Sequence, residues 1–543
     1  MTRTPARYAP SSALALFALT ALAIGAVWWW LGAPVALPSS PGLAGQKLFC
    51  VSYAPYRDGQ NPLVEGTYVQ PAQIDADLTL LAKYTDCVRT YSTQQGLDKV
   101  AEIAQRHGLK VLQGVWLGSD AEKNRREIAA AVAIAKKYPD TIRGIIVGNE
   151  VLLRGEMTPD DLIATLRAVK AQVPEPVSYA DVWEYWLRYR EVANAVDFVT
   201  IHVLPYWEDF PLPARLAAAH VDAIRKRVAA AIPGKQILIG ELGWPSAGRM
   251  REGALPSPSN QARVVDETLA LAKRENFHVN IIEAFDQPWK RRLEGTVGGN
   301  WGIFDRATGK PKFSFSGGSI SNHPQWPLQS LAGIVLAALT FGGAFVAGRG
   351  KAAPPLLWWR IAALSFLPAV LFGLTLANVP VESFTAGGWL RSLALACVAA
   401  LAPILCAAAY AARRPVPAFS GLLGGAGRTC GALTLALGLT FIALVLLSLQ
   451  AALGLTFDPR YRDIPFAPLS AAVVPFVFLW FSLPRPLGPR AVAERLAAAV
   501  LAISAVYIAF NETFANWQAI WFCSALLGLS FILAQARDAP DSE

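Results

Sequence analysis

The fold of this chain is indicated by a short apolar segment that ends on a carboxylate, residues 142–151, which read IRGIIVGNEV. Apolar residues fill the segment, and Glu150 follows directly on it. Residues 236–241 repeat the arrangement as QILIGE and end on Glu241. A short, nearly continuous apolar run is typical of a strand that is buried on both faces of a parallel sheet. Each glutamate is therefore predicted to lie at the C-terminal end of a buried strand.

Residues 46–315 alternate such strands with amphipathic helices along their whole length. One helical pattern places Ile74, Leu78 and Leu81 on a single face, and another opens at Thr158, a capping residue that a proline follows. This alternation is typical of a parallel α/β sheet. Eight strands in about 270 residues predict a (β/α)8 barrel, and a doubly wound sheet is the alternative. The predicted strands are Leu48–Tyr53, Cys87–Tyr91, Lys110–Trp116, Ile142–Gly148, Val177–Tyr179, Phe198–Val203, Gln236–Gly240 and Val279–Phe285.

Long apolar runs flank this segment on both sides. The first run, Ser11 to Leu37, follows Arg3 and Arg7 and carries three tryptophans at 28–30 near its outer end. About 20 apolar residues cross a bilayer, and interfacial aromatic residues mark the exit. The run therefore predicts a transmembrane anchor with a cytoplasmic N-terminus, and a cleaved signal peptide is the alternative.

After Pro324 the apolar runs return, and seven of them are long enough to predict membrane helices. With the anchor they make eight spans, which returns the C-terminus to the cytoplasm. Cytoplasmic loops are enriched in Lys and Arg, and twelve basic residues lie on the predicted cytoplasmic side against three outside. The runs are about 328–348, 357–379, 389–412, 431–453, 466–483, 496–514 and 517–536. The twelve are Arg3, Arg7, Arg349, Lys351, Arg360, Arg413, Arg414, Arg428, Arg485, Arg490, Arg495 and Arg537, and the three are Arg391, Arg460 and Arg462.

Composition agrees with a membrane protein that carries a folded extramembrane domain. Of the 543 residues, 53% are hydrophobic and 16% are charged, and the mean hydropathy is +0.34. These values exclude intrinsic disorder and argue against a purely soluble protein, which averages about 25% charged residues. The net charge of +9 does not indicate a nucleic-acid partner, because residues 46–323 hold 34 basic and 32 acidic groups and the excess lies beside the apolar runs.

Three segments are therefore expected. Residues 1–45 would form the cytoplasmic N-terminus and the anchor, residues 46–323 a barrel outside the cytoplasm, and residues 324–543 a membrane domain of about seven helices embedded in the lipid bilayer. The six cysteines form no CxxC motif and the five histidines show no ligand spacing. We therefore expect no metal and no cofactor.

The two glutamates are the strongest candidates for chemistry. Residues at the C-terminal ends of barrel strands project into the mouth where barrel active sites form, and the predicted fourth and seventh strands lie on opposite sides of it. Glycoside hydrolysis needs a carboxylate pair, in which one group protonates the leaving oxygen while the other attacks the sugar or activates water. Glu150 and Glu241 suit this chemistry, and salt bridges at the barrel mouth are the alternative.

The residues around both glutamates resemble a known family. VGNEV at 147–151 and GELGWPS at 240–246 resemble the acid/base and nucleophile motifs of glycoside hydrolase family 17, the retaining β-1,3-glucanases. Further matches in register are Val51–Tyr53, Val88–Tyr91 and Leu204–Trp207. The resemblance covers the barrel, about half of the chain. It implies that Glu150 is the proton donor, that Glu241 is the nucleophile and that the substrate is β-1,3-glucan.

One segment departs from the family pattern. Plant and fungal relatives follow strand eight with a phenylalanine, an acid-rich segment and a lysine, whereas residues 285–290 read FDQPWK here. The changed acid leaves the linkage preference and the recognition of chain ends open, but it does not affect the two glutamates. Asp286 and Trp289 in this segment are candidate substrate contacts.

Other side chains predicted at the mouth suit the same chemistry. A general acid must be protonated near neutral pH, so we expect the site to raise the pKa of Glu150. Asn149 is a candidate partner of the sugar 2-hydroxyl, and Arg89 is predicted to keep Glu241 charged, to form a buried barrel ion pair, or both. Aromatic faces bind the C–H faces of sugars, so a set of aromatic residues predicts a saccharide cleft, while core packing is the alternative for each ring. The set is Tyr53, Trp116, Trp183, Tyr206, Trp207, Trp244 and Trp289.

Three further signals are weaker. Cys50 and Cys87 lie on neighbouring predicted strands, where a disulfide would form in an oxidising compartment, and two buried thiols are the alternative. His202 is expected to be structural or to contact sugar. Residues 75–77, Asp-Ala-Asp, look like a nucleotide-sugar motif but are expected on the polar face of an amphipathic helix.

Two classes of function follow from these features. The first is a membrane-anchored enzyme that remodels or branches periplasmic or cell-surface β-glucan, as a glucanosyltransferase or alternatively as an endo-β-1,3-glucanase. Bacterial chains that resemble this one are commonly called β-(1→6)-glucan synthases, which implies a bacterial inner membrane. No nucleotide-sugar site is visible, so synthesis would be transglycosylation. The second class is a non-catalytic glucan-binding component beside a glucan synthase or export system.

Overall fold

The computed structural model describes residues 10–38, 45–315, 317–350, 354, 356–423, 431–484 and 488–537. The chain forms two compact units: residues 35–320 make one, and residues 1–34 together with 321–543 make the other. The N-terminal helix therefore packs with the C-terminal helices instead of forming a separate segment.

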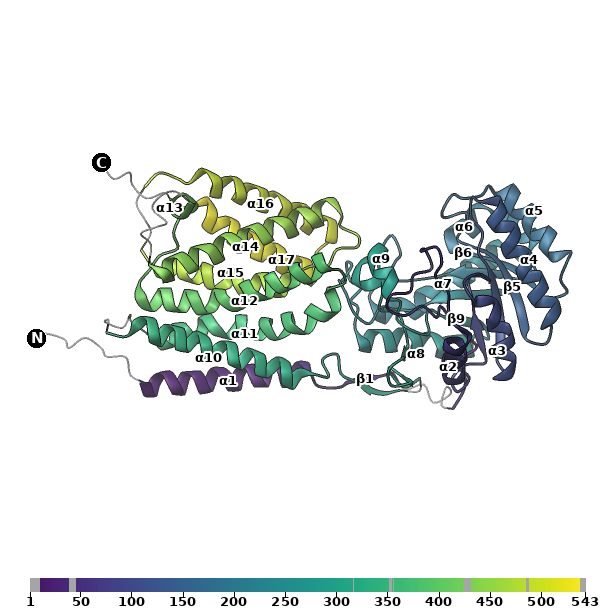
Figure 1. Cartoon of the computed structure of the whole chain (residues 1–543), viewed down its shortest axis with the longest axis horizontal. Coiled ribbons are helices and arrows are strands. Elements are labelled where there is room, and N and C mark those ends of the chain that lie inside the picture. Colours follow the sequence, from purple (N-terminus) through teal and green to yellow (C-terminus); the bar gives the residue numbers. More distant parts are fainter. Residues whose placement is uncertain are drawn as a thin grey trace, which may run out of the picture. The chain divides into compact units, whose positions relative to one another are not determined.

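The first unit is a closed barrel of eight parallel strands in the order β2 to β9 (Figure 1). This confirms the predicted barrel and excludes the doubly wound sheet, because β9 pairs with β2 and places Ile281 opposite Val51. The strands are largely apolar because helices cover their outer face and side chains fill the inside. The strands are β2 Cys50–Ser52, β3 Cys87–Arg89, β4 Lys110–Val115, β5 Ile142–Asn149, β6 Val177–Val182, β7 Val199–His202, β8 Ile237–Leu242 and β9 His278–Ile281.

Helices connect the strands and cover the barrel. Ile74, Leu78 and Leu81 are buried on one face of α2, as their spacing predicts. The Thr158 hydroxyl accepts a hydrogen bond from the Asp161 backbone N–H at 3.2 Å, so the expected cap begins α5. The helices are α2 Pro71–Leu81, α3 Val100–Arg106, α4 Ala121–Lys137, α5 Pro159–Lys170, α6 Trp183–Arg188, α7 Ala214–Ala231, α8 Pro258–Arg274 and α9 Arg291–Gly298, with 3-10 turns η2 Leu97–Lys99, η3 Arg190–Ala195 and η4 Pro288–Lys290.

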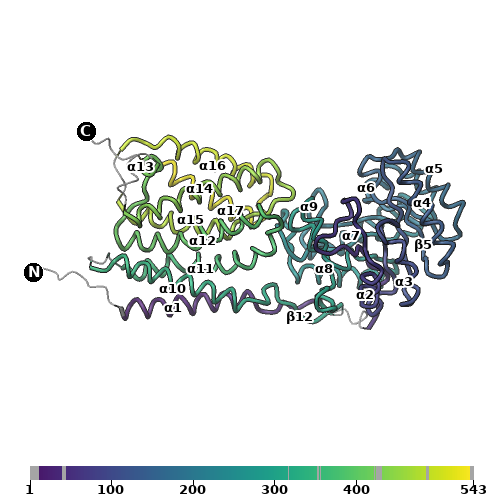
Figure 2. Tube along the Cα trace, in the orientation of Figure 1, coloured from purple at the N-terminus to yellow at the C-terminus, as the bar shows by residue number. Residues whose placement is uncertain are grey.

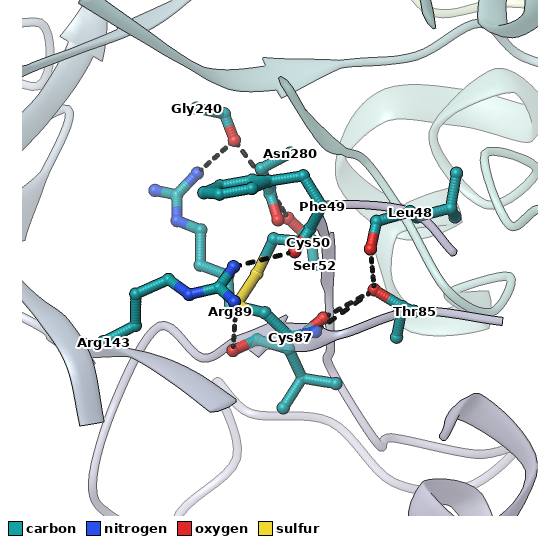
Figure 3. The surroundings of a disulfide bond; sticks show 11 residues. Leu48, Phe49, Cys50, Ser52, Thr85, Cys87, Arg89, Arg143, Gly240 and Asn280 are labelled. Atoms are coloured by element: carbon teal, nitrogen blue, oxygen red, sulfur yellow. Dashed lines mark hydrogen bonds between the residues drawn. A yellow bond between two sulfur atoms is a disulfide. The ribbon is translucent and has the colours of Figure 1, made fainter. Parts of the chain in front are cut away.

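The first two barrel strands are cross-linked. A disulfide joins Cys50 to Cys87, the first residues of β2 and β3 (Figure 3). The hydroxyl of Thr85 lies beside it, 3.1 Å from the Leu48 carbonyl oxygen and 2.9 Å from that of Cys87. The bond lies at the N-terminal end of the strands, opposite the mouth at which active sites form in such barrels.

Two short ribbons complete this unit. Strand β1 (Val35–Leu37) pairs antiparallel with β12 (Gly318–Ile320), so the chain enters and leaves the barrel unit along one ribbon. Strand β10 (Phe304–Asp305) pairs with β11 (Lys310–Pro311).

The second unit is a bundle of apolar helices. Seven helices of the described residues are long and apolar enough to cross a membrane. An eighth, α15 Phe466–Ser482, has 17 residues. At 1.5 Å per residue it is about 25 Å long, against a hydrocarbon core of about 30 Å. The span predicted at about 466–483 is therefore a shorter helix than the other seven. It packs against α11, α12 and α17. The seven are α1 Pro10–Leu31, α10 Trp326–Gly348, α11 Leu357–Glu382, α12 Ala386–Ala412, α14 Ala432–Phe457, α16 Val492–Glu512 and α17 Trp517–Ala534; α13 Phe419–Leu423 is a short turn of helix.

Helices α1 and α10 lie side by side in this unit (Figure 2). The basic residues Arg413 and Arg495 lie where α12 ends and α16 begins, whereas Arg391 lies near the start of α12. Among the residues used to predict topology, Arg3, Arg7, Lys351, Arg428 and Arg485 fall outside the described residues.

Candidate active site

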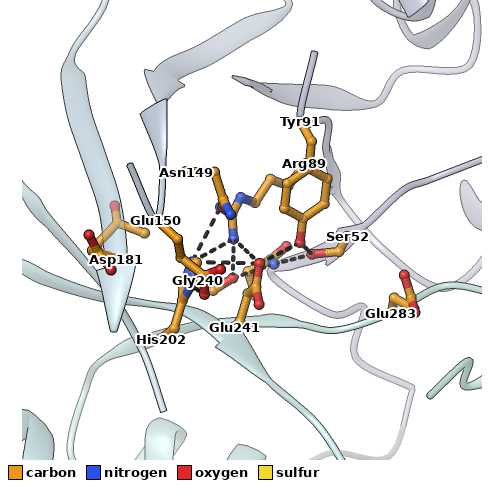
Figure 4. A network of polar contacts seen from close by, with 12 residues as sticks. Ser52, Arg89, Tyr91, Asn149, Glu150, Asp181, His202, Gly240, Glu241 and Glu283 are labelled. Carbon is orange, nitrogen blue, oxygen red and sulfur yellow. Dashed lines mark hydrogen bonds and ion pairs between the residues drawn. The ribbon is translucent and has the colours of Figure 1, made fainter. Parts of the chain in front are cut away.

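Both predicted glutamates lie together at the carboxyl ends of the barrel strands (Figure 4). Glu150 follows the last residue of β5, and Glu241 lies one residue before the end of β8. One carboxylate oxygen of each lies within 4.8 Å of the other and of a His202 ring nitrogen. The side chain of Glu241 is 7% exposed and that of Glu150 is 25% exposed. Glu241 therefore lies deeper, and Glu150 is partly exposed.

A sharp turn after β5 presents Glu150. Gly148 and Glu150 have φ angles of 89° and 54°, both in the left-handed region. Glycine adopts this region freely, and a Cβ at position 148 would lie 3.1 Å from the Val151 side chain. The Glu150 N–H donates to the Ala180 carbonyl of β6 at 2.8 Å. The neighbouring strand thus holds the unusual backbone conformation of Glu150.

Donors fix one oxygen of Glu241. The Tyr91 hydroxyl donates to Oε1 at 2.7 Å and Arg89 Nη1 does so at 3.4 Å. Burial, reinforced by the charge of Glu241, raises the pKa of Tyr91 well above its ordinary value, so the phenol keeps the proton that it donates. The Ser52 hydroxyl lies 2.9 Å from the same phenol. Sequence reasoning missed Tyr91 and Ser52 as site residues, although both lie within the matched strand motifs.

Arg89 is buried and joins three strands. It donates to the Gly240 carbonyl and to Asn149 Oδ1, both at 2.7 Å, and it pairs with Glu241. Its guanidinium also lies 4.6 Å from the centre of the Tyr91 ring. Arg89 therefore forms the buried ion pair considered above. Since the side-chain oxygen of Asn149 is occupied, its amide N–H groups are the ones left to meet a ligand.

The protonation of Glu150 differs from the sequence expectation. Burial alone would raise the pKa of this carboxyl, but the hydrogen bond from His202, together with the charges of Arg154 and Arg89, lowers the pKa from its ordinary value. The free protein therefore holds Glu150 as a carboxylate near neutral pH, and the expected raised pKa is wrong for this state. The sequence does not reveal that these three side chains converge on Glu150.

Glu150, His202 and Glu241 belong to residue types that ligate metals, and one atom of each lies within 4.8 Å of the others. Arg89, however, lies 3.4 Å from both Glu241 Oε1 and His202 Nε2 and would repel a cation there. We therefore assign no metal to this set. His202 is fully buried between the two carboxylates. It has no exposed side-chain surface with which to make the sugar contact that was considered from the sequence.

Three of the predicted aromatic contacts are buried in the core. Tyr53, Tyr206 and Trp244 have no exposed surface. Their polar atoms find partners inside the unit: the Tyr53 hydroxyl donates to Asp77 at 3.1 Å, the Tyr206 hydroxyl to a carbonyl at 2.9 Å and the Trp244 indole to a carbonyl at 3.0 Å. Asp77 is itself buried, not on a polar helix face as expected. These rings offer no surface to a sugar in this structure, and core packing is the role that it gives them.

The other predicted rings keep an accessible face. Trp183, Trp207 and Trp289 are partly buried, and Trp116 is 41% exposed. The Trp183 indole donates to Glu208 at 3.3 Å, and the Trp289 indole donates to a glutamine oxygen at 2.9 Å. The indole N–H groups of Trp183 and Trp289 are thus engaged, while part of each ring stays available for a sugar.

The segment after β9 contains two ion pairs. Asp286 pairs with Lys312 at 2.7 Å, and Lys290 pairs with Glu283 at 3.2 Å. Glu283 is buried, and burial raises its pKa to about 7 against the opposing charge of Lys290. Sequence reasoning named Asp286 as a substrate contact and missed Glu283. The reason is that the predicted last strand, Val279–Phe285, contains Glu283, whereas β9 ends at Ile281 in the structure.

Comparison with known proteins shows what the barrel is similar to. Residues 50–302 match the family model described as BtgE/BtgC glycoside hydrolase domain. A glucan 1,3-beta-glucosidase of Saccharomyces cerevisiae is 26% identical over 262 residues, which cover 44% of this chain and 84% of the yeast protein. One from Schizosaccharomyces pombe is 26% identical over 301 residues, which cover 51% and 88%. An active-site mutant of Rhizomucor miehei beta-1,3-glucanosyltransferase, solved with laminaritriose, is 24% identical with a TM-score of 0.45 over 50% of this chain and 98% of that one.

The matched region lies within the barrel unit, and it contains both glutamates. The barrel is thus similar to glycoside hydrolases of the BtgE/BtgC type, which confirms at domain level the resemblance to glycoside hydrolase family 17 and the enzyme class expected from it. The membrane-anchored bacterial type stays a prediction.

Proposed function

We propose that this protein is a retaining enzyme that cleaves β-1,3-glucan and passes the glycosyl unit to a sugar acceptor, as a glucanosyltransferase that remodels or branches glucan. The observation that supports this most is the pair of carboxylates from opposite strands, with oxygens within 4.8 Å. Retaining glycosidases hold their carboxyl groups about 5–5.5 Å apart, and inverting ones about 6.5–9.5 Å apart. The names of the relatives indicate the same substrate class.

In the first step Glu241 is the nucleophile and Glu150 the general acid. An oxygen of Glu241 attacks the anomeric carbon while Glu150 gives its proton to the glycosidic oxygen, so the bond to the leaving sugar breaks and a glycosyl ester forms. Because the pKa of Glu150 is lowered, only a minor fraction of the free protein carries this proton near neutral pH. This step should therefore slow as the pH rises.

In the second step Glu150, now a carboxylate, acts as the base. It takes the proton of the acceptor hydroxyl while that oxygen attacks the anomeric carbon and releases Glu241. Water at about 55 M competes with a sugar, so transfer dominates only when the acceptor is held in attack geometry, where effective molarities of about 10⁵ M are attainable. The accessible faces of Trp207 and Trp289 are the proposed acceptor platform.

The proposed location is a bacterial inner membrane, with the barrel in the periplasm and both termini in the cytoplasm. The disulfide between Cys50 and Cys87 supports a barrel outside the cytoplasm, because disulfides persist in oxidising compartments. The excess of basic residues on one side of the apolar runs supports the orientation. The bilayer is the partner of the helical unit. A glucan synthase or export system is a further proposed partner, because seven long helices exceed what a tether needs.

The test is to incubate the full-length protein in detergent with millimolar laminari-oligosaccharides and identify the products. Longer or branched products would support the transferase. Shortened products alone would support an endo-β-1,3-glucanase, which uses the same two glutamates with water as acceptor. No conversion, together with binding, would favour the non-catalytic export component.

The acceptor platform has its own test. Trp289→Ala should lower the ratio of transfer to hydrolysis while cleavage continues, because the acceptor is held less well and water is not. Trp359→Ala, at a 63% exposed tryptophan of the helical unit, is the matched control and should leave the ratio unchanged. An unchanged ratio in Trp289→Ala would remove this residue from the acceptor site.

A further inference from the structure

His202 lies between the two glutamates, and the steps above give it no part. It is the last residue of β7, and its side chain is fully buried. Its Nδ1 lies 2.8 Å from Glu150 Oε1, and its Nε2 lies 3.4 Å from each terminal nitrogen of Arg89 (Figure 4). Each ring nitrogen thus has a fixed neighbour from a different strand.

These neighbours determine where the imidazole proton lies. A guanidinium group only donates hydrogen bonds, so the Nε2 that faces Arg89 accepts and carries no proton. Nδ1 therefore carries the proton and donates it to the carboxylate of Glu150. A doubly protonated ring would direct its Nε2–H at Arg89, and the Oε1 of Glu241, at 3.6 Å, is too far to accept it well.

We propose that His202 is the positioning residue of Glu150: as a neutral imidazole protonated on Nδ1, it holds Oε1 and leaves Oε2 as the oxygen that exchanges the proton. This rests on the proposed function, since it takes Glu150 as the acid and base. In the first step the proton leaves Oε2 for the glycosidic oxygen, and in the second Oε2 takes the proton of the acceptor hydroxyl. His202 keeps its own proton throughout. Among the described residues, no hydrogen bond reaches Oε2 of Glu150, which fits this assignment.

The hydrogen bond from His202 also stabilises the carboxylate form of Glu150. Removing the donor should raise the proton affinity of Glu150, so that the acid stays protonated to higher pH. The basic limb of the kcat/KM profile should then move upward. A hydrogen bond to a charged group corresponds to a shift of about one to two pH units. A loss of packing alone would lower activity at every pH without moving the limb.

Other charged groups face His202 and Glu150, and their effects on the proton affinity of Glu150 must be distinguished from the effect of His202. Arg89 of β3, Glu241 of β8 and Arg154 after β5 lie around it, and Asp181 of β6 is the remaining titratable neighbour. Burial, with the charge of Glu150 added, raises the pKa of Asp181 to about 6. Since Asp181 carries a like charge, neutralising it would lower the proton affinity of Glu150. Asp181→Asn should therefore not move the basic limb upward.

The pH profile of the full-length protein in detergent tests the proposal with two matched variants. His202→Phe keeps the ring shape without a donor, whereas His202→Asn places an amide N–H near the position of Nδ1. We expect the basic limb of kcat/KM on laminari-oligosaccharides to shift upward by about one to two pH units in His202→Phe, and to stay near the native position in His202→Asn. An unmoved limb in His202→Phe, or the same shift in both variants, would overturn the proposal.

A second measurement determines the tautomer in the native protein and uses a variant only to assign the signal. The ¹⁵N NMR spectrum of the histidine-labelled protein reports which ring nitrogen carries the proton, and the missing signal in His202→Asn identifies His202 among five histidines. We expect a protonated Nδ1 and an unprotonated Nε2. The opposite tautomer would overturn the proposal. A native protein with the expected tautomer that cleaves no laminari-oligosaccharide would instead refute the proposed function, and with it the role of His202.

Discussion

Glu150 and Glu241 follow similar apolar strands in the sequence, but the fold gives them different surroundings. Oε1 of Glu241 is held by Tyr91 and Arg89 at the bottom of the mouth. Glu150 lies higher, against His202, and faces solvent with part of its side chain. A retaining mechanism needs this asymmetry, since one carboxylate must stay fixed beneath the sugar while the other exchanges protons at the surface.

The two roles can be told apart by chemical rescue. Glu241→Ala should abolish cleavage, and azide should restore only an α-configured glycosyl azide, because azide enters from the face that the nucleophile has vacated. Glu150→Ala should lower kcat/KM by about 10²–10⁴-fold and yield a β-configured azide from an activated aryl substrate. NMR of the products assigns the configuration, and a β-azide from Glu241→Ala would exchange the two assignments.

Glu283 should make the stability of the barrel depend on pH. Its pKa is raised by burial to about 7, above the value of about 4.3 expected in the unfolded chain. Between these pH values the folded state therefore binds more protons than the unfolded chain. The contribution of Glu283 to stability falls as the pH rises through this window. Glu283→Gln should flatten the slope of unfolding free energy against pH between about 4.5 and 7. The change in slope should correspond to at most one bound proton.

The control for this prediction is Glu65→Gln, at an exposed carboxylate of the same unit. Urea unfolding of both variants at a series of pH values gives the slopes. The native slope in Glu283→Gln would mean that another buried acid carries the dependence.

At the scale of elements, strands β2 and β3 are linked at both of their ends. They are joined by a parallel ladder, by the disulfide at their N-terminal ends and by the contact of Ser52 with Tyr91 at the mouth. The bond between Cys50 and Cys87 therefore stiffens the base of the two strands that deliver Arg89 and Tyr91 to the site.

Removing this disulfide should destabilise the barrel. The bond closes a segment with a sequence separation of 37 residues, for which the chain-entropy model gives about 3–4 kcal/mol. The variant with serine at both positions 50 and 87 should lower the free energy of barrel unfolding by this amount, as measured by urea titration with proteolysis of the unfolded barrel. The matched control is Cys397→Ser, which removes a cysteine outside the disulfide and should leave the free energy of barrel unfolding unchanged. Equal urea midpoints for the disulfide variant and this control would refute the prediction.

At the scale of the whole molecule, the chain combines a catalytic-type barrel with a helical unit that contains both the first and the last helices. Seven long apolar helices and the 17-residue α15 make an even number if α15 also crosses the bilayer. An odd number of spans would place the two termini on opposite sides of the membrane, so the state of α15 decides the topology.

We predict eight spans and two cytoplasmic termini, because the basic residues near the apolar runs are distributed twelve to three. A reporter that is active only in the cytoplasm, fused after Glu543, should be active, and one that requires the periplasm should be silent. As a matched control, the same reporters inserted after Gly488, before α16, should give the same answer as the C-terminal fusion. Periplasmic activity at Glu543 would mean that α15 does not span.

The sequence alone determined the barrel and its two glutamates because these features depend on local pattern. Apolar strands and amphipathic helices differ in period, so each β/α unit can be recognised separately. Glu150 and Glu241 stand at the strand ends, and the barrel topology then brings such ends to one mouth. The apolar helices are equally local, since a span is recognised from its length and composition.

Only the tertiary structure decided which side chains meet. His202, Arg89, Tyr91 and Glu241 come from three different strands and the loop after one of them, and no local pattern shows that they converge within hydrogen-bond distance. The lowered pKa of Glu150 follows from that convergence, because burial and opposing donors act through distances in space. The burial of Tyr53, Tyr206 and Trp244 was hidden for the same reason, since an aromatic residue at a strand end suits a core and a sugar platform equally well until its neighbours are known.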